Sequence, residues 1–132
     1  MSKETDKATD KETDKETTTN EVSNAIPLTQ EQFEAMWWTK DPASPYLKGF
    51  FIYFTAAWCK PCKLLDQPAI EAAIQTVGVP YYKCDETINK YTSGYCNIRK
   101  FPTFQFCKPK ALVGSLSSAN TEEVVAWIHG FV

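Results

Sequence analysis

The sequence predicts a single α/β domain that is built on a mixed β-sheet. Residues 50–54 form a short, continuous apolar run, which is typical of a strand buried on both faces of a sheet. Segments with helical and strand-like spacing of apolar residues alternate along the rest of the chain. Near the C-terminus two strand-like segments are close enough to form a hairpin. We therefore expect a sheet that is parallel first and antiparallel at its end.

The first half of the domain is expected to contain two helices around this buried strand. Thr29 has the position of a helix N-cap, and Gln32 is placed to complete a capping box. Apolar residues follow at helical spacing: Phe33, Met36 and Trp37. After the strand, a second helix is predicted from about Pro61 to Val77, and Pro68 within it is expected to produce a kink.

The second half is expected to complete the sheet and to end with a helix. Gly78 breaks the preceding helix, and Thr87–Tyr95 predicts a short helix or an irregular segment. Three strand-like segments are present, the last two pairing as a hairpin: Tyr81–Cys84, Thr103–Cys107 and Leu112–Leu116. Asn120 is the predicted N-cap of the final helix. Its apolar stripe consists of Val124, Trp127, Ile128 and Phe131.

The N-terminal segment has a different composition from the rest of the chain. It repeats the pattern Lys-Glu-Thr-Asp, and its net charge up to Glu21 is −3. A segment with almost no apolar residues cannot form a core. We expect residues 1–24 to be a disordered charged tail, whose functional alternative is a docking or solubilising arm, and residues 25–132 to be the folded domain.

The overall charge and hydropathy exclude several classes of function. The chain has 132 residues and a net charge of −2, and the part after the tail carries only +1, so a nucleic-acid partner is not expected. No apolar run has the length of a membrane span, and the N-terminus resembles neither a signal peptide nor a mitochondrial presequence. The expectation is a monomeric cytoplasmic protein in a reducing compartment.

Five cysteines are an odd number for a disulfide framework, so cysteine chemistry is the stronger interpretation. Cys59 and Cys62 are three residues apart, where the buried strand meets the next helix. A thiolate at a helix start is stabilised by unpaired amides and by the helix dipole, and Lys60 and Lys63 add positive charge. Cys59 is the expected nucleophile and Cys62 the resolving thiol, while Pro61 stiffens the ring that they close.

Three alternatives remain for these cysteines. A zinc site would need a second ligand pair, yet His129 is the only histidine, and Cys84, Cys96 and Cys107 are scattered singly. The pair could also be inert, or the domain could be a binding module that retains the motif. Cys84 and Cys107 are expected to be buried, whereas Cys96 is the one that exposure would open to oxidation or dimerisation.

Three segments of the chain resemble the thioredoxin family: Phe54–Lys63, which surrounds the cysteine pair; Phe101–Phe106; and Ser117–Asn120. The resemblance covers about Thr29 to Val132. It implies a thioredoxin fold, in which helices flank a central mixed sheet on both faces. It also implies an enzyme that reduces protein disulfides, that receives electrons from a disulfide reductase, and that uses the Cys59–Cys62 disulfide in place of a bound cofactor or metal.

The resemblance further implies how a substrate is bound. Pro102 is expected to be cis and to lie beside the cysteine pair, where the adjacent backbone pairs with the substrate chain. Trp58, Phe101 and the loop at Ser118 are expected to form an apolar rim around it. The complete set of implied substrate-binding residues is Trp58, Lys60, Pro61, Phe101, Pro102 and Ser118.

Two positions that tune the site depart from the family pattern. Tyr53 occupies the place of a buried aspartate that is thought to move the proton of the resolving cysteine. A phenol, whose ordinary pKa is about 10, is a poor proton acceptor near neutrality. Lys83, which neighbours that aspartate in the family, is retained and is expected either to assist Cys62 directly or to reach solvent. Slower resolution by Cys62 is predicted.

Two further departures affect the potential and the range of partners. Lys60 replaces a glycine, and its charge beside Cys59 is expected to stabilise the thiolate and make the potential less negative than that of an ordinary thioredoxin. Ser118 replaces a glycine of the docking surface. Together with Tyr53, these changes leave open an oxidoreductase that serves one dedicated partner.

Overall fold

The computed structural model describes residues 25–132, and the tail predicted for residues 1–24 lies outside them. The strands are β1 (Ile26–Pro27), β2 (Phe50–Thr55), β3 (Tyr81–Asp85), β4 (Thr103–Lys108) and β5 (Ala111–Ser117). The α-helices are α1 (Gln30–Trp37), α2 (Gln67–Val77), α3 (Lys90–Tyr95) and α4 (Thr121–His129). Two 3₁₀ turns, η2 (Pro45–Lys48) and η3 (Pro61–Leu64), complete the described elements.

The five strands form one mixed sheet in the order β1-β3-β2-β4-β5. β1 and β2 both run parallel to β3, whereas β4 is antiparallel to β2 and to β5. The change from parallel to antiparallel pairing is the one that the sequence predicts. β1 was not predicted, because two exposed residues show no periodicity. It is recognisable only through its pairing, in which Ile26 lies opposite Tyr82.

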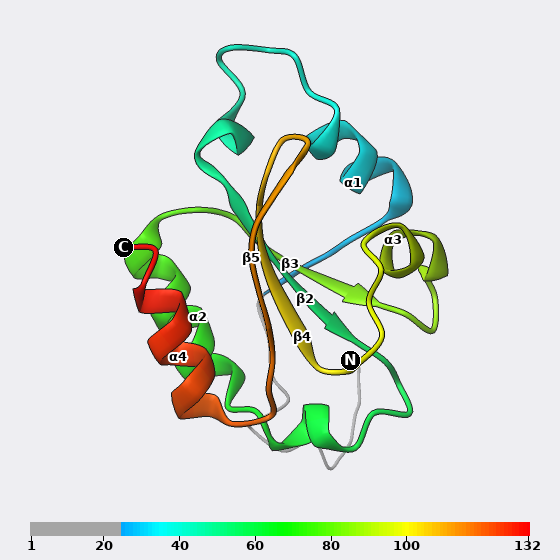
Figure 1. The fold of residues 1–132 in the computed structure, drawn as a ribbon, viewed down its shortest axis with the longest axis vertical. Coiled ribbons are helices and arrows are strands. Elements are labelled where there is room, and N and C mark those ends of the chain that lie inside the picture. The colour runs from blue at the N-terminus through cyan, green and yellow to red at the C-terminus, as the bar shows by residue number, and fades with distance from the viewer. Residues whose placement is uncertain (1–24) are drawn as a thin grey trace, which may run out of the picture.

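Helices cover both faces of the sheet, so each face has its own apolar core (Figure 1). On one face, Phe51 of β2 and Phe104 of β4 pack with Ile70 of α2 and Ile128 of α4. On the other face, Phe50, Ile52 and Phe54 of β2 pack with Phe33 and Met36 of α1. β2 contributes to both cores, and all six of its residues are buried, as predicted for a central strand.

The predicted long helix after β2 is instead two separate elements. The turn η3 ends at Leu64, and the backbone of the next residue, Leu65, is extended. Helix α2 then begins at Gln67 with Asp66 as its N-cap. Pro68 lies in the first turn of α2, where its missing N–H costs no hydrogen bond. The expectation that Pro68 kinks a continuous helix is therefore wrong, because this proline starts a helix.

Most of the predicted helix ends are confirmed. Thr29 and Asn120 cap α1 and α4 with their side chains, and Gly78 ends α2 in the left-handed conformation with φ 80°. The capping box at α1 is incomplete, however. The Gln32 side chain donates to the Tyr46 hydroxyl at 3.2 Å, which ties α1 to η2.

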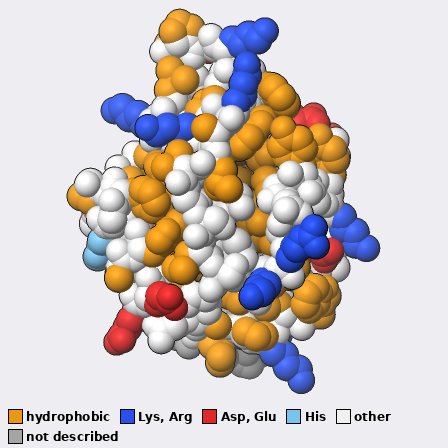
Figure 2. Space-filling view, viewed as in Figure 1, with side chains coloured by type: hydrophobic (Ala, Val, Ile, Leu, Met, Phe, Trp, Pro, Cys, Tyr) orange, Lys and Arg blue, Asp and Glu red, His pale blue; other side chains and the backbone are white. Residues whose placement is uncertain are grey.

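The visible surface is chemically mixed. On the face in Figure 2, Lys and Arg side chains occur at several separate places, with apolar groups between them. Within residues 25–132, none of the helices combines the length and the apolar character that crossing a bilayer requires.

Candidate active site

The cysteine pair follows the buried strand β2 in a loop that neighbouring segments hold in place. The Ala57 N–H donates to the Thr87 hydroxyl at 2.9 Å, and the Glu86 N–H donates to the Thr55 carbonyl at 2.8 Å. Both bonds join the end of β2 to the segment after β3. The Cys59 N–H closes the loop by donating to the Ala56 carbonyl at 3.0 Å. The sheet therefore fixes where Cys59 lies.

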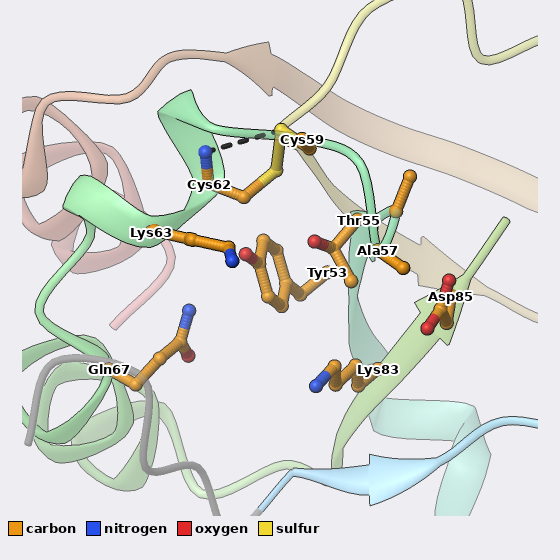
Figure 3. Close-up of a pocket in the computed structure, with 10 residues that line it drawn as sticks. Tyr53, Thr55, Ala57, Cys59, Cys62, Lys63, Gln67, Lys83 and Asp85 are labelled. Atoms are coloured by element: carbon orange, nitrogen blue, oxygen red, sulfur yellow. Dashed lines mark hydrogen bonds between the residues drawn. A yellow bond between two sulfur atoms is a disulfide. The ribbon is translucent and has the colours of Figure 1, made fainter. Parts of the chain in front are cut away.

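Cys59 and Cys62 form a disulfide, with an Sγ–Sγ distance of 2.14 Å and a Cα–Cα distance of 5.5 Å. Both residues are buried, with exposed fractions of 2% and 6%. The Cys62 N–H donates to the Cys59 sulfur at 3.2 Å (Figure 3). The same donor would hold a thiolate on Cys59 after reduction, whereas within residues 25–132 no N–H donates to the Cys62 sulfur. The geometry thus supports Cys59 as the attacking thiol.

The helix dipole contributes less to this thiolate than the sequence suggests. Cys62 belongs to η3, a turn of four residues, and the break at Leu65 separates it from α2. The charge at a helix N-terminus acts mainly within its first turn, so α2 has little influence on Cys59. What remains is the Cys62 N–H together with the positive charge of Lys60 and Lys63, which adjoin the two cysteines in the sequence. Pro61 is the first residue of η3, as predicted.

Two of the predicted rim residues, Trp58 and Phe101, are in contact with each other. The Trp58 ring is 63% exposed and meets the Phe101 ring edge to face, with 5.4 Å between their centroids. The Phe101–Pro102 peptide bond is cis, as the resemblance implies. The roles of these residues in substrate binding remain predictions.

Ser118 lies close to this rim through the pairing of β4 with β5. Thr103, which follows Pro102, is paired with Ser117, and their hydroxyl oxygens are 2.6 Å apart. The Ser118 hydroxyl, however, donates to the Glu123 carboxylate at 2.7 Å and accepts from the Asn120 N–H at 3.0 Å. It therefore helps to hold the start of α4, which is a use of this side chain that the sequence did not indicate.

A cavity of about 200 Å³, open to solvent on one side, lies beside the disulfide. Cys59 and Cys62 line it together with six polar side chains: Tyr53, Thr55, Lys63, Gln67, Lys83 and Asp85. Tyr53 is buried, stacks on Phe104 at 4.9 Å and is the register partner of Lys83. The two predicted tuning residues, Tyr53 and Lys83, therefore do lie beside the cysteines. Lys60, in contrast, is exposed and outside the lining.

Sequence reasoning missed Gln67 and Asp85 in this cavity. Gln67 is only 3% exposed, and its Oε1 accepts from the Tyr81 hydroxyl at 3.0 Å. A signal for it was present, because Gln67 shares the apolar face of α2 with Ile70 and Ile74, three and seven residues further on. Asp85 ends β3 and could be placed only through the pairing of β3 with β2.

The other three cysteines lie in the opposite core. Cys84 and Cys107 are fully buried, as predicted, and Cys96 is half-buried. Burial raises the pKa of Cys84 and of Cys96 to about 12, and it also raises the pKa of Cys107. These thiols are protonated at neutral pH, which works against regulatory oxidation at Cys96. Within residues 25–132, no group of three or more His, Cys, Asp or Glu side chains is arranged to hold a metal ion.

Comparisons with known proteins agree with this geometry. The thioredoxin family model matches residues 24–130. Thioredoxin from Callithrix jacchus is 33% identical over 79 residues, which cover 60% of this chain and 75% of the relative. Thioredoxin from the sponge Geodia cydonium is 39% identical over 70 residues, which cover 52% of this chain and 66% of the relative.

Solved structures show the same fold. Plasmodium falciparum thioredoxin superposes with a TM-score of 0.68 at 24% identity, over 82% of this chain and 100% of that one. Oxidised mitochondrial thioredoxin 3 from Saccharomyces cerevisiae superposes with a TM-score of 0.64 at 26% identity, over 80% of this chain and 94% of that one. With the disulfide in place at the end of β2, this chain belongs to the thioredoxin family of thiol–disulfide oxidoreductases.

Proposed function

We propose that this protein is a reductant of protein disulfides in which Cys59 attacks and Cys62 resolves. The observation that carries the proposal is the closed Cys59–Cys62 disulfide with the Cys62 N–H directed at the Cys59 sulfur. This arrangement stabilises negative charge on the sulfur that must act as the nucleophile. It also keeps the second sulfur within bonding distance of the first, so that resolution needs no large movement.

The reaction consists of two exchanges. The Cys59 thiolate attacks one sulfur of a substrate disulfide, and the other substrate sulfur leaves as a thiolate that takes up a proton. Cys62 then loses its proton and attacks the Cys59 sulfur of the mixed disulfide, which releases the second substrate thiol. Two electrons have passed to the substrate, and the Cys59–Cys62 disulfide has formed. A disulfide reductase supplies two electrons to open it again.

The rim around the pair supplies the docking surface. Trp58 and the neighbouring Leu64 are 63% and 68% exposed, and they flank a disulfide that is itself buried. A substrate chain would lie against Trp58, Phe101 and the backbone next to Pro102, with Pro61 and Lys60 on the other side and the Ser118 loop at the end. Apolar side chains that are exposed together in this way favour protein partners.

The proposal also includes the setting of the protein. It acts as a monomer, without a bound cofactor or metal, because the two thiols hold the transferred electrons. Neither nucleic acid nor a membrane is a partner, in keeping with the small charge of the part after the tail. A reducing compartment such as the cytoplasm suits three free thiols that are protonated at neutral pH.

Reduction of insulin by the full chain, with dithiothreitol as the electron source, tests the function. We expect turnover that Cys59→Ser abolishes and that Cys96→Ser, as a matched cysteine control, leaves intact. If wild type and Cys59→Ser accelerate insulin reduction equally, the domain is a binding module that retains the motif.

A dedicated partner is the second candidate, and Ser118 favours it. Its hydroxyl and β-carbon occupy a place where family members often have glycine, and its bonds to Glu123 and Asn120 fix it there. A narrower surface would slow a general substrate such as insulin. Ser118→Gly should then raise the rate of insulin reduction, and an unchanged rate would favour the general reductant.

A further inference from the structure

The pocket beside the disulfide is open to solvent on one side, and its lining combines the exposed Lys63 and the half-buried Lys83 and Asp85 with the buried Gln67. It measures about 200 Å³, which is far more than one water molecule needs. Strands β2 and β3, the turn η3 and the first turn of α2 all contribute to its lining. In Figure 3 the side chains of Lys63, Gln67 and Lys83 enter the same space from different elements.

Gln67 supplies a hydrogen-bond donor without an acceptor. Gln67 is only 3% exposed, and its Oε1 already accepts a hydrogen bond from the Tyr81 hydroxyl. The Nε2 group has no hydrogen-bond partner. Figure 3 shows this amide directed into the cavity, towards Lys63 and Tyr53. A buried donor that stays unpaired destabilises the fold, so this group is suited to an acceptor that occupies the cavity.

The charges of the lining favour an anion. The charged groups of the lining are two ammonium groups, on Lys63 and Lys83, and one carboxylate, on Asp85. Asp85 lies at the far side, beyond Thr55, and its Oδ1 accepts from the Thr87 N–H at 2.9 Å. The family's buried aspartate, which would add a second negative charge here, is replaced by Tyr53, whose phenol is neutral near pH 7. The part of the cavity next to Gln67 is therefore positively charged.

We propose that this cavity binds a small tetrahedral oxyanion of the phosphate or sulfate type. Its oxygen atoms would accept hydrogen bonds from the Lys63 and Lys83 ammonium groups and from Gln67 Nε2. A tetrahedral oxyanion presents several acceptors in different directions, and this matches donors that come from three separate elements. The cavity is large enough to hold it, and the unpaired amide gains a partner.

The bound anion is coupled to the redox state, and this part of the inference rests on the proposed function. Reduction replaces the neutral disulfide by two sulfurs, of which Cys59 is the one proposed to carry negative charge as a thiolate. That charge is next to the anion and repels it, so the oxidised form binds the anion more tightly. By linkage, the anion must then make the midpoint potential more negative. A tenfold preference for the oxidised form corresponds to a shift of about 30 mV.

A titration of the oxidised full chain with inorganic phosphate tests the binding. Amide shifts are followed by ¹H–¹⁵N NMR at constant ionic strength, with chloride as the balancing anion. We expect saturable shifts centred on residues 63, 67 and 83. Gln67→Met and Lys83→Met should each weaken binding at least tenfold, whereas Lys60→Met, which removes the charge of a lysine outside the lining, should change it less than twofold. Dispersed spectra of each variant confirm that it is folded.

Two results would overturn the proposal. One is the lack of saturable shifts around the cavity, and the other is equal weakening by Lys60→Met and Lys83→Met, which would indicate a general charge effect. Because the oxidised protein is titrated without any substrate, these results are independent of insulin reduction. The coupling is tested separately by the midpoint potential with and without phosphate, where an unchanged or less negative value would refute it.

Discussion

The five cysteines occupy two contrasting settings within one small sheet. Cys59 and Cys62 lie where β2 ends, in a turn that directs an N–H at one of the sulfurs and that has lysines close by. Cys84, Cys96 and Cys107 lie in or against the opposite apolar core, where burial raises the pKa of each thiol. The same side chain is therefore reactive or inert according to whether its surroundings favour the thiolate or the thiol.

Alkylation provides the largest expected difference between the two settings. In the reduced protein at pH 7, iodoacetamide should modify Cys59 at least 100-fold faster than Cys96, since a thiol with a pKa of about 12 is almost entirely protonated. Mass spectrometry of digested, time-resolved samples measures the two rates. Unfolding in urea should bring the rates of all five cysteines within about tenfold, as the control. Comparable rates in the folded protein would remove the contrast.

The rate at which Cys62 resolves a mixed disulfide should depend on the residue at position 53, which lines the same cavity. Tyr53→Asp restores a carboxylate in the cavity, and we expect it to shorten the lifetime of a mixed disulfide with Cys59 by about tenfold, because a positioned general base speeds proton removal. Rapid-quench trapping measures the lifetime. Tyr53→Phe keeps the ring that stacks on Phe104 and should leave the lifetime unchanged. Equal lifetimes for wild type and Tyr53→Asp would show that this position does not control resolution.

The buried thiols should make stability depend on pH in the alkaline range. In the folded protein the pKa of these thiols is raised above the unfolded value of about 8.5. Their contribution to the free energy of unfolding is therefore complete below pH 8.5 and is lost as pH rises towards the folded pKa. Between about pH 8.5 and 10, each thiol should lower the free energy of unfolding by roughly 1.4 kcal/mol per pH unit at most.

Urea unfolding of the Cys59→Ser/Cys62→Ser double variant under reducing conditions removes the contribution of the active-site pair and retains that of the other three thiols. Adding Cys96→Ala should reduce the slope of the free energy of unfolding against pH by the contribution of one titrating thiol. A stability that is independent of pH across this window would mean that the thiols are not shielded from water.

The smallest expected effect concerns Lys60. Because this side chain is exposed and outside the cavity, its charge is screened, and Lys60→Gly should make the midpoint potential more negative by roughly 20 mV or less. Equilibration with glutathione measures the potential, and high salt should diminish the difference. A less negative potential in the variant would contradict the prediction that Lys60 stabilises the thiolate.

Much of the fold is predictable because it depends on local patterns. The central strand, the hairpin and the caps at Thr29 and Asn120 follow from apolar spacing and from the chemistry of single side chains. The start of α2 was mispredicted although its signal is local, since Asp66 followed by Pro68 is typical of a helix N-terminus. β1 has no such signal, because it exists only through pairing.

The candidate site also has parts that the sequence predicts and parts that it does not. Cys59 and Cys62 are apparent from their spacing, and the family resemblance indicates Trp58 and Pro102. The cavity could not be predicted from the sequence, because four elements that are distant in the chain create it. Gln67 in particular looks like any polar residue at a helix start until its burial and its bond to Tyr81 are known.

The break at Leu65 has a consequence for how this active site can vary. Since Asp66 caps α2 on its own, and since its N–H donates to the Thr121 hydroxyl at 3.0 Å, the helix is anchored independently of the turn before it. Residues 58–64 thus form a segment whose two ends are held independently, by the end of β2 on one side and by the start of α2 on the other. Substitutions within this segment, such as lysine for glycine at position 60, can change the reactivity of the two cysteines while the sheet and α2 keep their structure.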